Sequence, residues 1–371
     1  MILVLNSGSS SVKYRLVSLD DPGPGPGGVV ERIGEPGGVA DHRAAVERVF
    51  AALPGDRQAI RAVGHRVVHG GVEFRSPTLI DDAVVATLRD LIPLAPLHNP
   101  GGIAGIEAAQ AALPDVPHVA VFDTAFHATL PDAASTYAID RAVATRYGIR
   151  RFGFHGTSFE YVAASTAALL RRPLEELNLI VLHLGNGASA AAIAGGRSVE
   201  TSMGMSPLEG LVMGTRSGDV DPAILSYLHR VAGMDFEDVS ELLERRSGLA
   251  GLCGDNDIRD VLARRAAGDE AAVLAFDVYC HRIRKYVGAY HAVLGRLDAV
   301  VFTAGIGERT PEIREATMAG LQSWGITVDP ARNVAGPPAR IISEPSAPVA
   351  VCVVPTDEEW AIAQRVQALT G

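Results

Sequence analysis

Two arginines of this chain lie among glycines, Arg66 within Gly64–Gly71 and Arg216 within Gly214–Gly218. A guanidinium group presents a planar fork of N–H donors that matches a carboxylate or a phosphate. Small neighbours let an anion approach closely, so both segments indicate contact with a planar anion. The alternative for each is an ordinary solvated loop arginine, whose ion pairs contribute little to stability.

A carboxylate and an imidazole occupy comparable positions. Asp123 follows an apolar run, where it suits a metal-bound water or a general base, or else caps a helix. His155 is flanked by Gly-Phe and Gly, which argues against a packed core position, although a lone histidine is more often structural. Asn6 and Glu358 lie beside apolar strand patterns and could hold Mg²⁺ through waters, but their spacing alone does not establish this.

Three segments of small residues are typical of phosphate contacts. Asn6–Ser11 lies between an apolar run and the alternating pattern Val12–Leu16, which predicts a β-hairpin that carries Lys13. Gly185–Ser189 likewise separates two strand patterns, and Gly305–Arg309 is expected to be a glycine loop that follows a strand and enters a helix. The first segment lacks the Gly-Lys-Ser/Thr spacing of a P-loop. Backbone N–H groups in such turns can approach phosphate oxygens closely, whereas an ordinary turn is the alternative for each segment alone.

The surrounding elements alternate between strand and helix patterns, which favours an α/β fold in each half. The strand–turn–strand plan occurs in both halves and indicates an internal duplication, with a nucleotide held in a cleft between two related lobes. We expect lobes at residues 1–124 and 125–358, with a final helix at 359–371 returning to the first. Strands are predicted at 2–5, 12–16, 62–68, 116–122, 179–184, 299–302 and 349–354. Helices are predicted at 41–53, 81–91, 103–113, 157–170, 222–231, 236–245 and 271–294, with another that has Thr310 as its N-cap. Residues 355–369 are expected to be a strand end that leads into the last helix.

The composition is typical of a globular enzyme. Of the 371 residues, 47% are apolar and 20% are charged, which is enough for two cores. The net charge is −10 and the basic residues are dispersed, so no footprint for nucleic acid is present. Cys253, Cys280 and Cys352 are widely spaced and fit buried thiols in a reducing compartment. No stretch has the length of a membrane span and no signal peptide is present, so we expect a cytoplasmic location.

In nine short segments the chain resembles the acetokinase family, a branch of the acetate and sugar kinase, Hsp70 and actin superfamily. The resemblance is carried by Asn6–Lys13, His65–Gly71, Phe122–His127, Phe154–Ser158, His183–Gly187, Pro207–Leu211, Met213–Arg216, Ala304–Glu308 and Pro355–Glu359. It implies two duplicated ribonuclease H-like domains of the actin-like ATPase type. It also implies a homodimer that transfers the γ-phosphoryl group of ATP to acetate reversibly, with Mg²⁺ or Mn²⁺, in the interconversion of acetate and acetyl-CoA alongside a phosphotransacetylase.

The resemblance also implies roles for individual residues. Asp123 is the essential carboxylate, and His155 and Arg216 stabilise the transition state. Arg66 binds the substrate carboxylate or acyl phosphate, while Val68, Leu97 and Pro207 line an apolar pocket. Asn6 and Glu358 are associated with Mg²⁺. The nucleotide-binding residues are Ser9, Ser11, Lys13, His183, Leu184, Gly185, Asn186, Gly187, Asp257, Ile258, Arg259, Gly305, Ile306, Gly307, Glu308 and Arg309.

The chemistry that the resemblance implies is direct in-line transfer. A carboxylate is already a nucleophile, so no general base is required. The charge on a metaphosphate-like group could be neutralised by Arg216, His155 and the metal. We therefore expect Asp123 to organise Mg²⁺ or the site rather than to abstract a proton.

Several positions depart from the family pattern. Ile258 stands where an aromatic ring usually contacts adenine, Phe159 replaces a second histidine, and Arg309 replaces an asparagine. The nucleotide base preference is therefore open. The segment Asp20–Gly38 is rich in Gly and Pro, and we expect it to be a flexible surface connection without a functional role.

Three alternatives to an acetate kinase stay open at this point. A propionate or butyrate kinase would share the scaffold, because one methylene changes discrimination by only about 1–3 kcal/mol. An ATP-switched chaperone of the Hsp70 kind would carry a substrate-binding domain after its ATPase, and only one helix follows Pro355–Glu359 here. A catalytically inactive nucleotide-binding regulator is disfavoured because the predicted catalytic set is intact.

Overall fold

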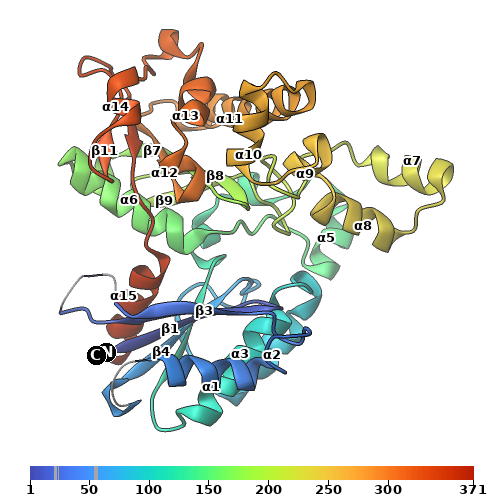
Figure 1. Ribbon diagram of the computed structural model, residues 1–371, viewed down its shortest axis with the longest axis vertical. Coiled ribbons are helices and arrows are strands. Elements are labelled where there is room, and N and C mark those ends of the chain that lie inside the picture. Colours follow the sequence, from blue (N-terminus) through green and yellow to red (C-terminus); the bar gives the residue numbers. More distant parts are fainter. Residues whose placement is uncertain (21–22, 24, 54–56) are drawn as a thin grey trace. The chain divides into compact units, whose positions relative to one another are not determined.

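The computed structural model describes residues 1–20, 23, 25–53 and 57–371. It divides into two compact units, shown in Figure 1. The first unit is Met1–Ala128 with Phe154–Tyr161 and Asp357–Gly371, and the second is Thr129–Gly153 with Val162–Thr356. The first unit therefore also includes residues 125–128, Phe154–Tyr161 and residues 357–358, which the sequence assigned to the second lobe.

A six-stranded sheet in the order β3-β2-β1-β4-β6-β5 forms the centre of the first unit. Its strands are β1 (Ile2–Ser7), β2 (Ser11–Val17), β3 (Gly27–Glu31), β4 (Ala62–Val67), β5 (Thr78–Leu79) and β6 (His118–Phe122). Strands β1, β4 and β6 are parallel, whereas β2, β3 and β5 are antiparallel to their neighbours. The predicted hairpin is confirmed, since β1 and β2 pair Asn6 with Lys13.

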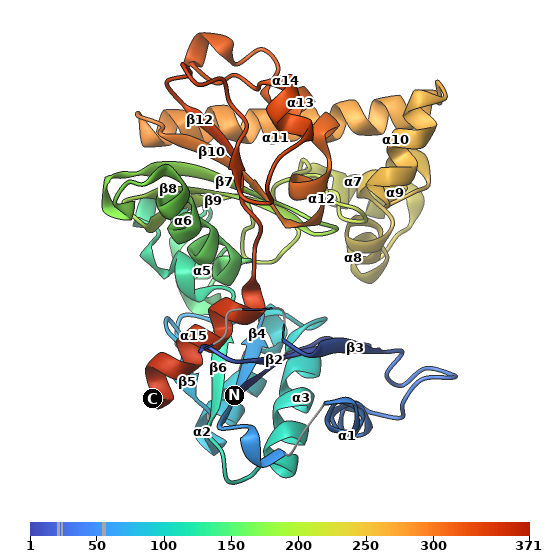
Figure 2. The same ribbon diagram turned by 60° about the vertical axis from the view of Figure 1, so that its left-hand side comes forward.

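Helices cover both faces of this sheet, as Figure 2 shows. Because successive side chains of a strand point to opposite faces, Leu3 and Leu5 of β1 face one side and Ile2 and Val4 face the other. The first face packs against α1 (His42–Ala52), α2 (Asp82–Asp90) and α3 (Asn99–Ala112). The second packs against α15 (Glu358–Thr370). Full burial of one aliphatic side chain contributes about 1.5–3 kcal/mol, so α15 is an integral part of this core.

Aspartates fix where these helices begin. The Asp41 and Asp81 side chains accept hydrogen bonds of 2.8 Å from backbone N–H groups in the first turns of α1 and α2. Asp357 accepts one of 2.9 Å from Trp360 at the start of α15. Such caps are worth about 1 kcal/mol each, and the last of them places Glu358 in the first turn of α15.

The second unit repeats the plan of the first. Its six-stranded sheet has the order β11-β12-β10-β7-β8-β9. The strands are β7 (Asn178–Leu184), β8 (Ala188–Ala194), β9 (Arg197–Thr201), β10 (Ala299–Thr303), β11 (Arg340–Ile341) and β12 (Ala350–Val353). Taken in chain order, β7 to β12 match β1 to β6 in neighbours and in direction. The predicted duplication and α/β class are confirmed.

The remaining helices lie around or beside the second sheet. They are α4 (Asp132–Ser135), α5 (Arg141–Tyr147), α6 (Gly156–Leu170), α7 (Ala223–Ala232), α8 (Phe236–Arg245), α9 (Gly248–Cys253), α10 (Ile258–Ala266), α11 (Glu270–Leu294), α12 (Ala304–Arg309), α13 (Pro311–Met318) and α14 (Pro330–Val334). Helix α11 packs on β7 and β8. In the part of the chain that the structure describes, no helix is long and apolar enough to cross a membrane. The three cysteines are buried and free, as predicted.

Two predictions of loops were wrong. The segment Gly305–Arg309 is helical, because α12 starts at Ala304 directly after β10. Within Asp20–Gly38, residues 27–31 form the edge strand β3 rather than a flexible connection, while residues 21, 22 and 24 lie outside the described residues. Glycine is needed in β3 because a Cβ at position 27 would lie 2.7 Å from the carbonyl oxygen of Tyr14. Glycine content reflected close strand approach here, not disorder.

Candidate functional site

Arg66, on β4, is the centre of the polar contacts in the first unit. Its Nε and Nη2 donate to the two carboxylate oxygens of Asp123 at 3.0 and 2.6 Å. Oε2 of Glu358 lies 3.6 Å from Nε. The parallel strands explain this gathering, because Asn6 on β1 is in register with Arg66 and Asp123 directly follows β6. The carboxyl ends of adjacent parallel strands meet at one edge of a sheet.

The Arg66–Asp123 pair is largely removed from solvent. The side chains are 18% and 1% exposed. Burial favours a neutral Arg66, but Asp123 and Glu358 outweigh it and raise the pKa of the guanidinium above its usual value. Arg66 therefore stays charged and oriented. Its Nη1 has no hydrogen-bond partner among the described residues, so it can still donate to an anion.

His155 is tied to Asp123 through the backbone. The N–H of Gly156 donates to the carbonyl oxygen of Asp123 at 2.9 Å, and a Cβ at Gly156 would lie 2.3 Å from that oxygen. His155 itself has φ of 57°, in the left-handed region. A non-glycine residue there carries about 1–3 kcal/mol of strain, which is common at functional sites. Glycine is thus required at 156, and the strained turn sets where α6 begins.

The serine loop between β1 and β2 is a tight turn at the surface. The N–H of Gly8 donates to the carbonyl oxygen of Ser11 at 2.8 Å. Ser9 is exposed and Ser11 is half-buried. Lys13 forms an ion pair with Glu359, and its side chain is 56% exposed. The loop therefore offers small residues and one partly exposed cation, and its contact with phosphate stays a prediction.

The residues predicted to line an apolar pocket fall in different units. Val68 is half-buried just after β4 and Leu97 is 42% exposed, both in the first unit. Pro207 is half-buried in the second unit, on the irregular segment that joins β9 to α7. Their joint role stays a prediction.

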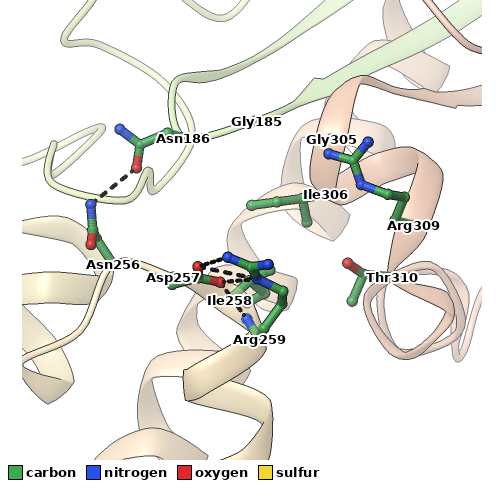
Figure 3. A pocket seen from close by; sticks show the side chains of 10 residues that line it. All are labelled: Gly185, Asn186, Asn256, Asp257, Ile258, Arg259, Gly305, Ile306, Arg309 and Thr310. Atoms are coloured by element: carbon green, nitrogen blue, oxygen red, sulfur yellow. Dashed lines mark hydrogen bonds and ion pairs between the residues drawn. The ribbon is translucent and has the colours of Figure 1, made fainter. Parts of the chain in front are cut away.

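A cavity of about 530 Å³ lies within the second unit (Figure 3). It brings together all three segments that the sequence predicted for the nucleotide beyond the serine loop. The lining residues are Gly185, Asn186, Asn256, Asp257, Ile258, Arg259, Gly305, Ile306, Arg309 and Thr310. Sequence reasoning missed Asn256 and Thr310, although each directly adjoins a predicted segment. Within the described chain, His183, Leu184, Gly187, Gly307 and Glu308 do not line this cavity.

Local contacts hold the walls of this cavity. Asn256 Nδ2 donates to Asn186 Oδ1 at 3.4 Å, and the N–H of Gly214 donates to the carbonyl oxygen of Asn186 at 2.9 Å. Asp257 caps α10 and pairs with Arg259, whose hydrogen bonds lower the pKa of Asp257 to about 2. Ile258 is only 6% exposed, so it contributes an aliphatic wall rather than an open surface.

The cavity residues at the start of α12 come directly after a second strained residue. Ala304 has φ of 62° between β10 and α12. This abrupt change of direction starts α12 without a loop and presents Gly305 and Ile306 to the cavity. A helix that starts directly after a buried strand in this way supplies backbone N–H groups for anion binding.

Arg216 differs from Arg66 in its partners. Its Nη1 donates to the carbonyl oxygen of Pro207 at 3.2 Å. Burial lowers the pKa of its guanidinium, with Glu244 acting weakly in the opposite direction. Among the described residues, no carboxylate lies within ion-pair distance of Arg216, and Glu244 acts on it only through its charge. The same Nη1 also lies 3.9 Å from Met213 Sδ. A partly buried guanidinium with neutral hydrogen-bond partners and no carboxylate is suited to an anionic ligand.

Oxygen donors near Arg66 bear on a divalent cation. Asn6, Asp123 and Glu358 supply one amide and two carboxylates at the sheet edge. Across the described residues, no three His, Cys, Asp or Glu side chains are grouped as in a metal site made by protein alone. Mg²⁺ usually takes one or two carboxylates, with waters and substrate phosphates completing its shell. The donor set fits Mg²⁺ held in that way.

The whole chain is similar to proteins of one family. Residues 1–364 match the model of the acetokinase family. An acetate kinase from Streptomyces coelicolor is 55% identical over 394 residues, which cover 100% of this chain and 97% of that protein. An acetate kinase from Clavibacter michiganensis is also 55% identical, over 393 residues that cover 100% of this chain and 99% of that protein.

Solved structures share the fold over the full length. Acetate kinase from Porphyromonas gingivalis has a TM-score of 0.94 at 40% identity, covering 100% of this chain and 99% of that one. A propionate kinase from Francisella tularensis has a TM-score of 0.92 at 38% identity, covering 99% of both chains. The similarity therefore includes both units.

Proposed function

We propose that this chain, which belongs to the acetokinase family, transfers the γ-phosphoryl group of ATP reversibly to acetate, giving acetyl phosphate and ADP. The observation that carries the proposal is the 55% identity to acetate kinases over all of this chain. The geometry supports it, because two arginines suited to anions, a set of oxygen donors and a cavity of about 530 Å³ are each present.

Arg66 would bind the acyl acceptor. Asp123 holds its Nε and Nη2, so the remaining Nη1 can donate to a carboxylate in a fixed direction. Asp123 thus orients the guanidinium of Arg66. It does not need to accept a proton, because the substrate carboxylate is already ionised. Mg²⁺ would be held by Asn6 and Glu358, directly or through waters, and when bound it supplies neutralising charge to the phosphates.

Arg216 and His155 would stabilise the transferring group. Phosphoryl transfer places negative charge on equatorial oxygens, and fixed cations and donors aimed at them lower the barrier. Arg216 suits this role because a carbonyl group, and not a carboxylate, is its partner. The Gly185, Ile258 and Gly305 segments would hold the nucleotide in the cavity of the second unit.

The proposed function is tested by trapping the product. The enzyme would be incubated with ATP, Mg²⁺ and either acetate, propionate or butyrate, and acyl phosphate would be measured as hydroxamate. We expect the highest kcat/KM with acetate and loss of product in Arg216→Ala. No hydroxamate with any acid, from a protein that still binds ATP, would overturn the proposal.

Propionate is the second candidate acceptor. The 38% identity and TM-score of 0.92 to a propionate kinase favour keeping it in view. Discrimination of one methylene is worth about 1–3 kcal/mol, so the panel of acids should separate the two by roughly 10- to 200-fold in kcat/KM.

We also propose a homodimer formed through the second unit. Apolar side chains of α7 and α8 support this, because Tyr227, Val231 and Phe236 are 57%, 67% and 79% exposed. Exposed apolar groups of this kind mark interaction surfaces. Sedimentation should give a dimer for the wild-type chain and a monomer for the double variant Val231→Asp/Phe236→Asp. A double variant with the same mass as the wild type would refute this surface.

A further inference from the structure

The segment of residues 202–222, between β9 and α7, is ordered without a helix or strand. Its residues are buried at 202–204 and again at 210–214. Irregular backbone in such a place needs side chains to satisfy its N–H and C=O groups. The segment also carries Pro207, which is predicted to line the acyl pocket, and Arg216, which the proposed function assigns to the transferring phosphoryl group.

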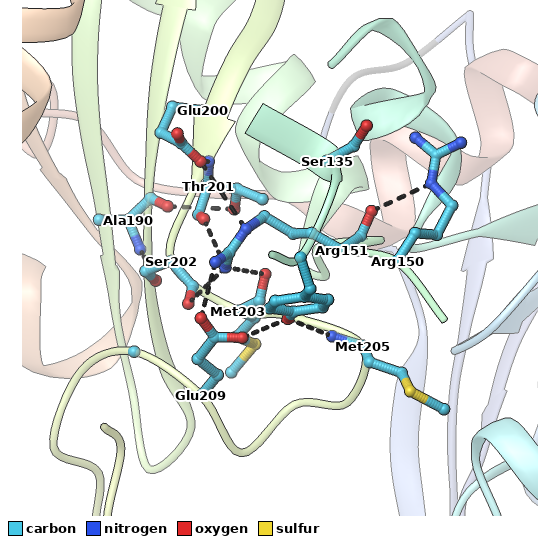
Figure 4. Close-up of polar contacts among 12 residues, drawn as sticks. Ser135, Arg150, Arg151, Ala190, Glu200, Thr201, Ser202, Met203, Met205 and Glu209 are labelled. Atoms are coloured by element: carbon cyan, nitrogen blue, oxygen red, sulfur yellow. Dashed lines mark hydrogen bonds and ion pairs between the residues drawn. The ribbon is translucent and has the colours of Figure 1, made fainter. Parts of the chain in front are cut away.

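Arg151 holds the beginning of this segment (Figure 4). Its Nη1 donates to three successive carbonyl oxygens, those of Thr201, Ser202 and Met203, at 3.1, 3.3 and 3.2 Å. Its Nη2 donates to Oε1 of Glu209 at 2.6 Å. The Arg151 side chain is 16% exposed, so these bonds are mostly shielded from water. One guanidinium therefore joins residues 201–203 to residue 209.

Tyr137 closes the same arrangement from the other side. Its hydroxyl donates to Oε2 of Glu209 and accepts a hydrogen bond of 3.0 Å from the N–H of Met205. Burial raises the pKa of Tyr137 above its usual value, so this hydroxyl keeps its proton. A Cβ at Gly204 would lie 1.8 Å from Glu209 Oε2 and 2.0 Å from the Tyr137 oxygen. Only glycine leaves room for the pair.

The far end of the segment has its own anchor. Asp219 Oδ1 accepts from the N–H of Gly210 at 2.9 Å, and Oδ2 accepts from the Tyr286 hydroxyl at 2.8 Å. Arg282 Nη1 donates to the carbonyl oxygen of Gly210 at 3.0 Å. Between the two anchors, the Arg216–Pro207 hydrogen bond of 3.2 Å connects the functional residues to each other.

We propose that Arg151, Glu209 and Tyr137 are positioning residues that set both the choice of acyl acceptor and the placement of Arg216. The inference rests on the roles proposed for Pro207 and Arg216. Glu209 is two residues from Pro207, and both of its carboxylate oxygens are held, so its release would let Pro207 shift. Because Pro207 accepts from Arg216, the guanidinium would shift with it.

Nucleotide binding should be spared by loss of these contacts. The cavity is lined by the β7–β8 turn, α10 and α12. Gly214 does not line the cavity, but its N–H donates to the carbonyl oxygen of the lining residue Asn186. This part of the segment is anchored separately, because the N–H groups of Leu249 and Ala250 on α9 donate to the carbonyl oxygens of Met213 and Gly214, each at 2.9 Å. A change in acid selectivity with unchanged ATP affinity is therefore the expected signature.

The test compares Tyr137→Phe and Glu209→Gln with two matched controls in the second unit. Tyr147→Phe removes an exposed hydroxyl, and Arg172→Lys alters an arginine–carboxylate pair with Asp298 at 2.8 Å. The readouts are KM for acetate and propionate, kcat, and the Kd of ATP measured by calorimetry without acid. We expect KM for acetate to rise about tenfold in each test variant, since one charge-assisted hydrogen bond is lost. The acetate-to-propionate ratio of kcat/KM should fall, with the Kd of ATP within twofold of wild type.

Two results of this experiment would contradict the inference. Wild-type kinetics in both test variants would overturn the inference, and so would a parallel loss of ATP affinity, which indicates general damage. If Glu209→Gln does not fold, Tyr137→Phe decides alone, because it keeps the ring and removes one oxygen. A wild-type enzyme that forms no acyl phosphate would instead refute the proposed function. The wild-type enzyme is therefore assayed before any variant is made.

Discussion

The two arginines that look alike in the sequence have different surroundings in the fold. Arg66 is bound by the carboxylate of Asp123, which is 1% exposed, whereas Arg216 is held by the carbonyl group of Pro207. Removing one member of a buried ion pair leaves the other charge without compensation, which costs about 3–5 kcal/mol. Removing a cation that has no counterion leaves no such uncompensated charge. Substitution of Arg66 should therefore lower stability, whereas substitution of Arg216 should mainly lower the rate of catalysis.

Arg66→Ala is expected to lower the free energy of unfolding by about 3 kcal/mol and to raise KM for acetate. Arg216→Ala should leave stability within about 1 kcal/mol of wild type and chiefly lower kcat. Urea titration and steady-state kinetics measure the two effects. Arg66→Ala/Asp123→Asn should recover much of the lost stability but no activity. Equal losses of stability and of both kinetic parameters in the two single variants would contradict this assignment.

At the scale of elements, glycines that seem to make room for ligands often make room for the protein itself. A Cβ at Gly64 would lie 2.7 and 2.8 Å from methyl groups of Ile362 and Val366 on α15, and one at Gly214 would lie 1.9 Å from Asn186 Oδ1. Gly70 similarly admits the ring of Phe122, 2.8 Å from its Cβ position. The glycines around Arg66 thus allow α15 to approach β4, and that approach brings Glu358 to Arg66.

Helix α15 should therefore control the stability of the first unit. Ile362→Ala is expected to destabilise this unit by about 2–5 kcal/mol, because Ile362 is 1% exposed against the sheet. Leu369→Ala, at a 43% exposed position of the same helix, should change stability by less than about 0.5 kcal/mol. Hydrogen exchange would follow the strands of each unit separately. Equal loss of protection in both sheets of the Ile362 variant would argue against this localised effect.

Local patterns made the elements predictable, and long-range contacts did not appear in them. The β1–β2 and β7–β8 hairpins follow from alternation and turn chemistry, so the duplication was readable in the sequence. Strand β3 was missed because its glycines serve pairing with Tyr14, and α12 because its glycines resemble a loop. The Arg66–Asp123 pair joins residues 57 positions apart and the Tyr137–Glu209 contact joins residues 72 apart. No spacing rule relates such positions before the fold is known.

For the molecule as a whole, buried neutral histidines make stability depend on pH. His127 is 1% exposed and shares a 3.0 Å hydrogen bond with the carbonyl oxygen of Phe154, and burial lowers its pKa to about 4. His65 is 3.0 Å from His118, and burial lowers both of their pKa values. All three belong to the first unit. The folded state resists protonation there, whereas the unfolded chain takes up protons below about pH 6.5.

The free energy of unfolding should therefore be fully retained above pH 6.5 and fall progressively as the pH drops toward 4. His127 alone should account for a loss on the order of 2 kcal/mol by pH 5. Urea titrations between pH 7.5 and 4.5 measure this slope. His127→Gln should flatten it, and His229→Gln, at an exposed position on α7, should not. A slope that is the same in all three proteins would assign the acid sensitivity to other groups.

The packing of α15 has a consequence for how the protein is made. The strands of the first sheet leave the ribosome early, but Ile362, Ala363 and Val366, which cover one of its faces, are translated after all of the second unit. Domains generally fold as units during synthesis. The second unit can thus complete its core first. Until α15 is made, Ile2, Val4 and Val121 remain on an uncovered apolar face of the first sheet. A nascent chain stalled before α15 should be a chaperone client, although most of its sequence is already present.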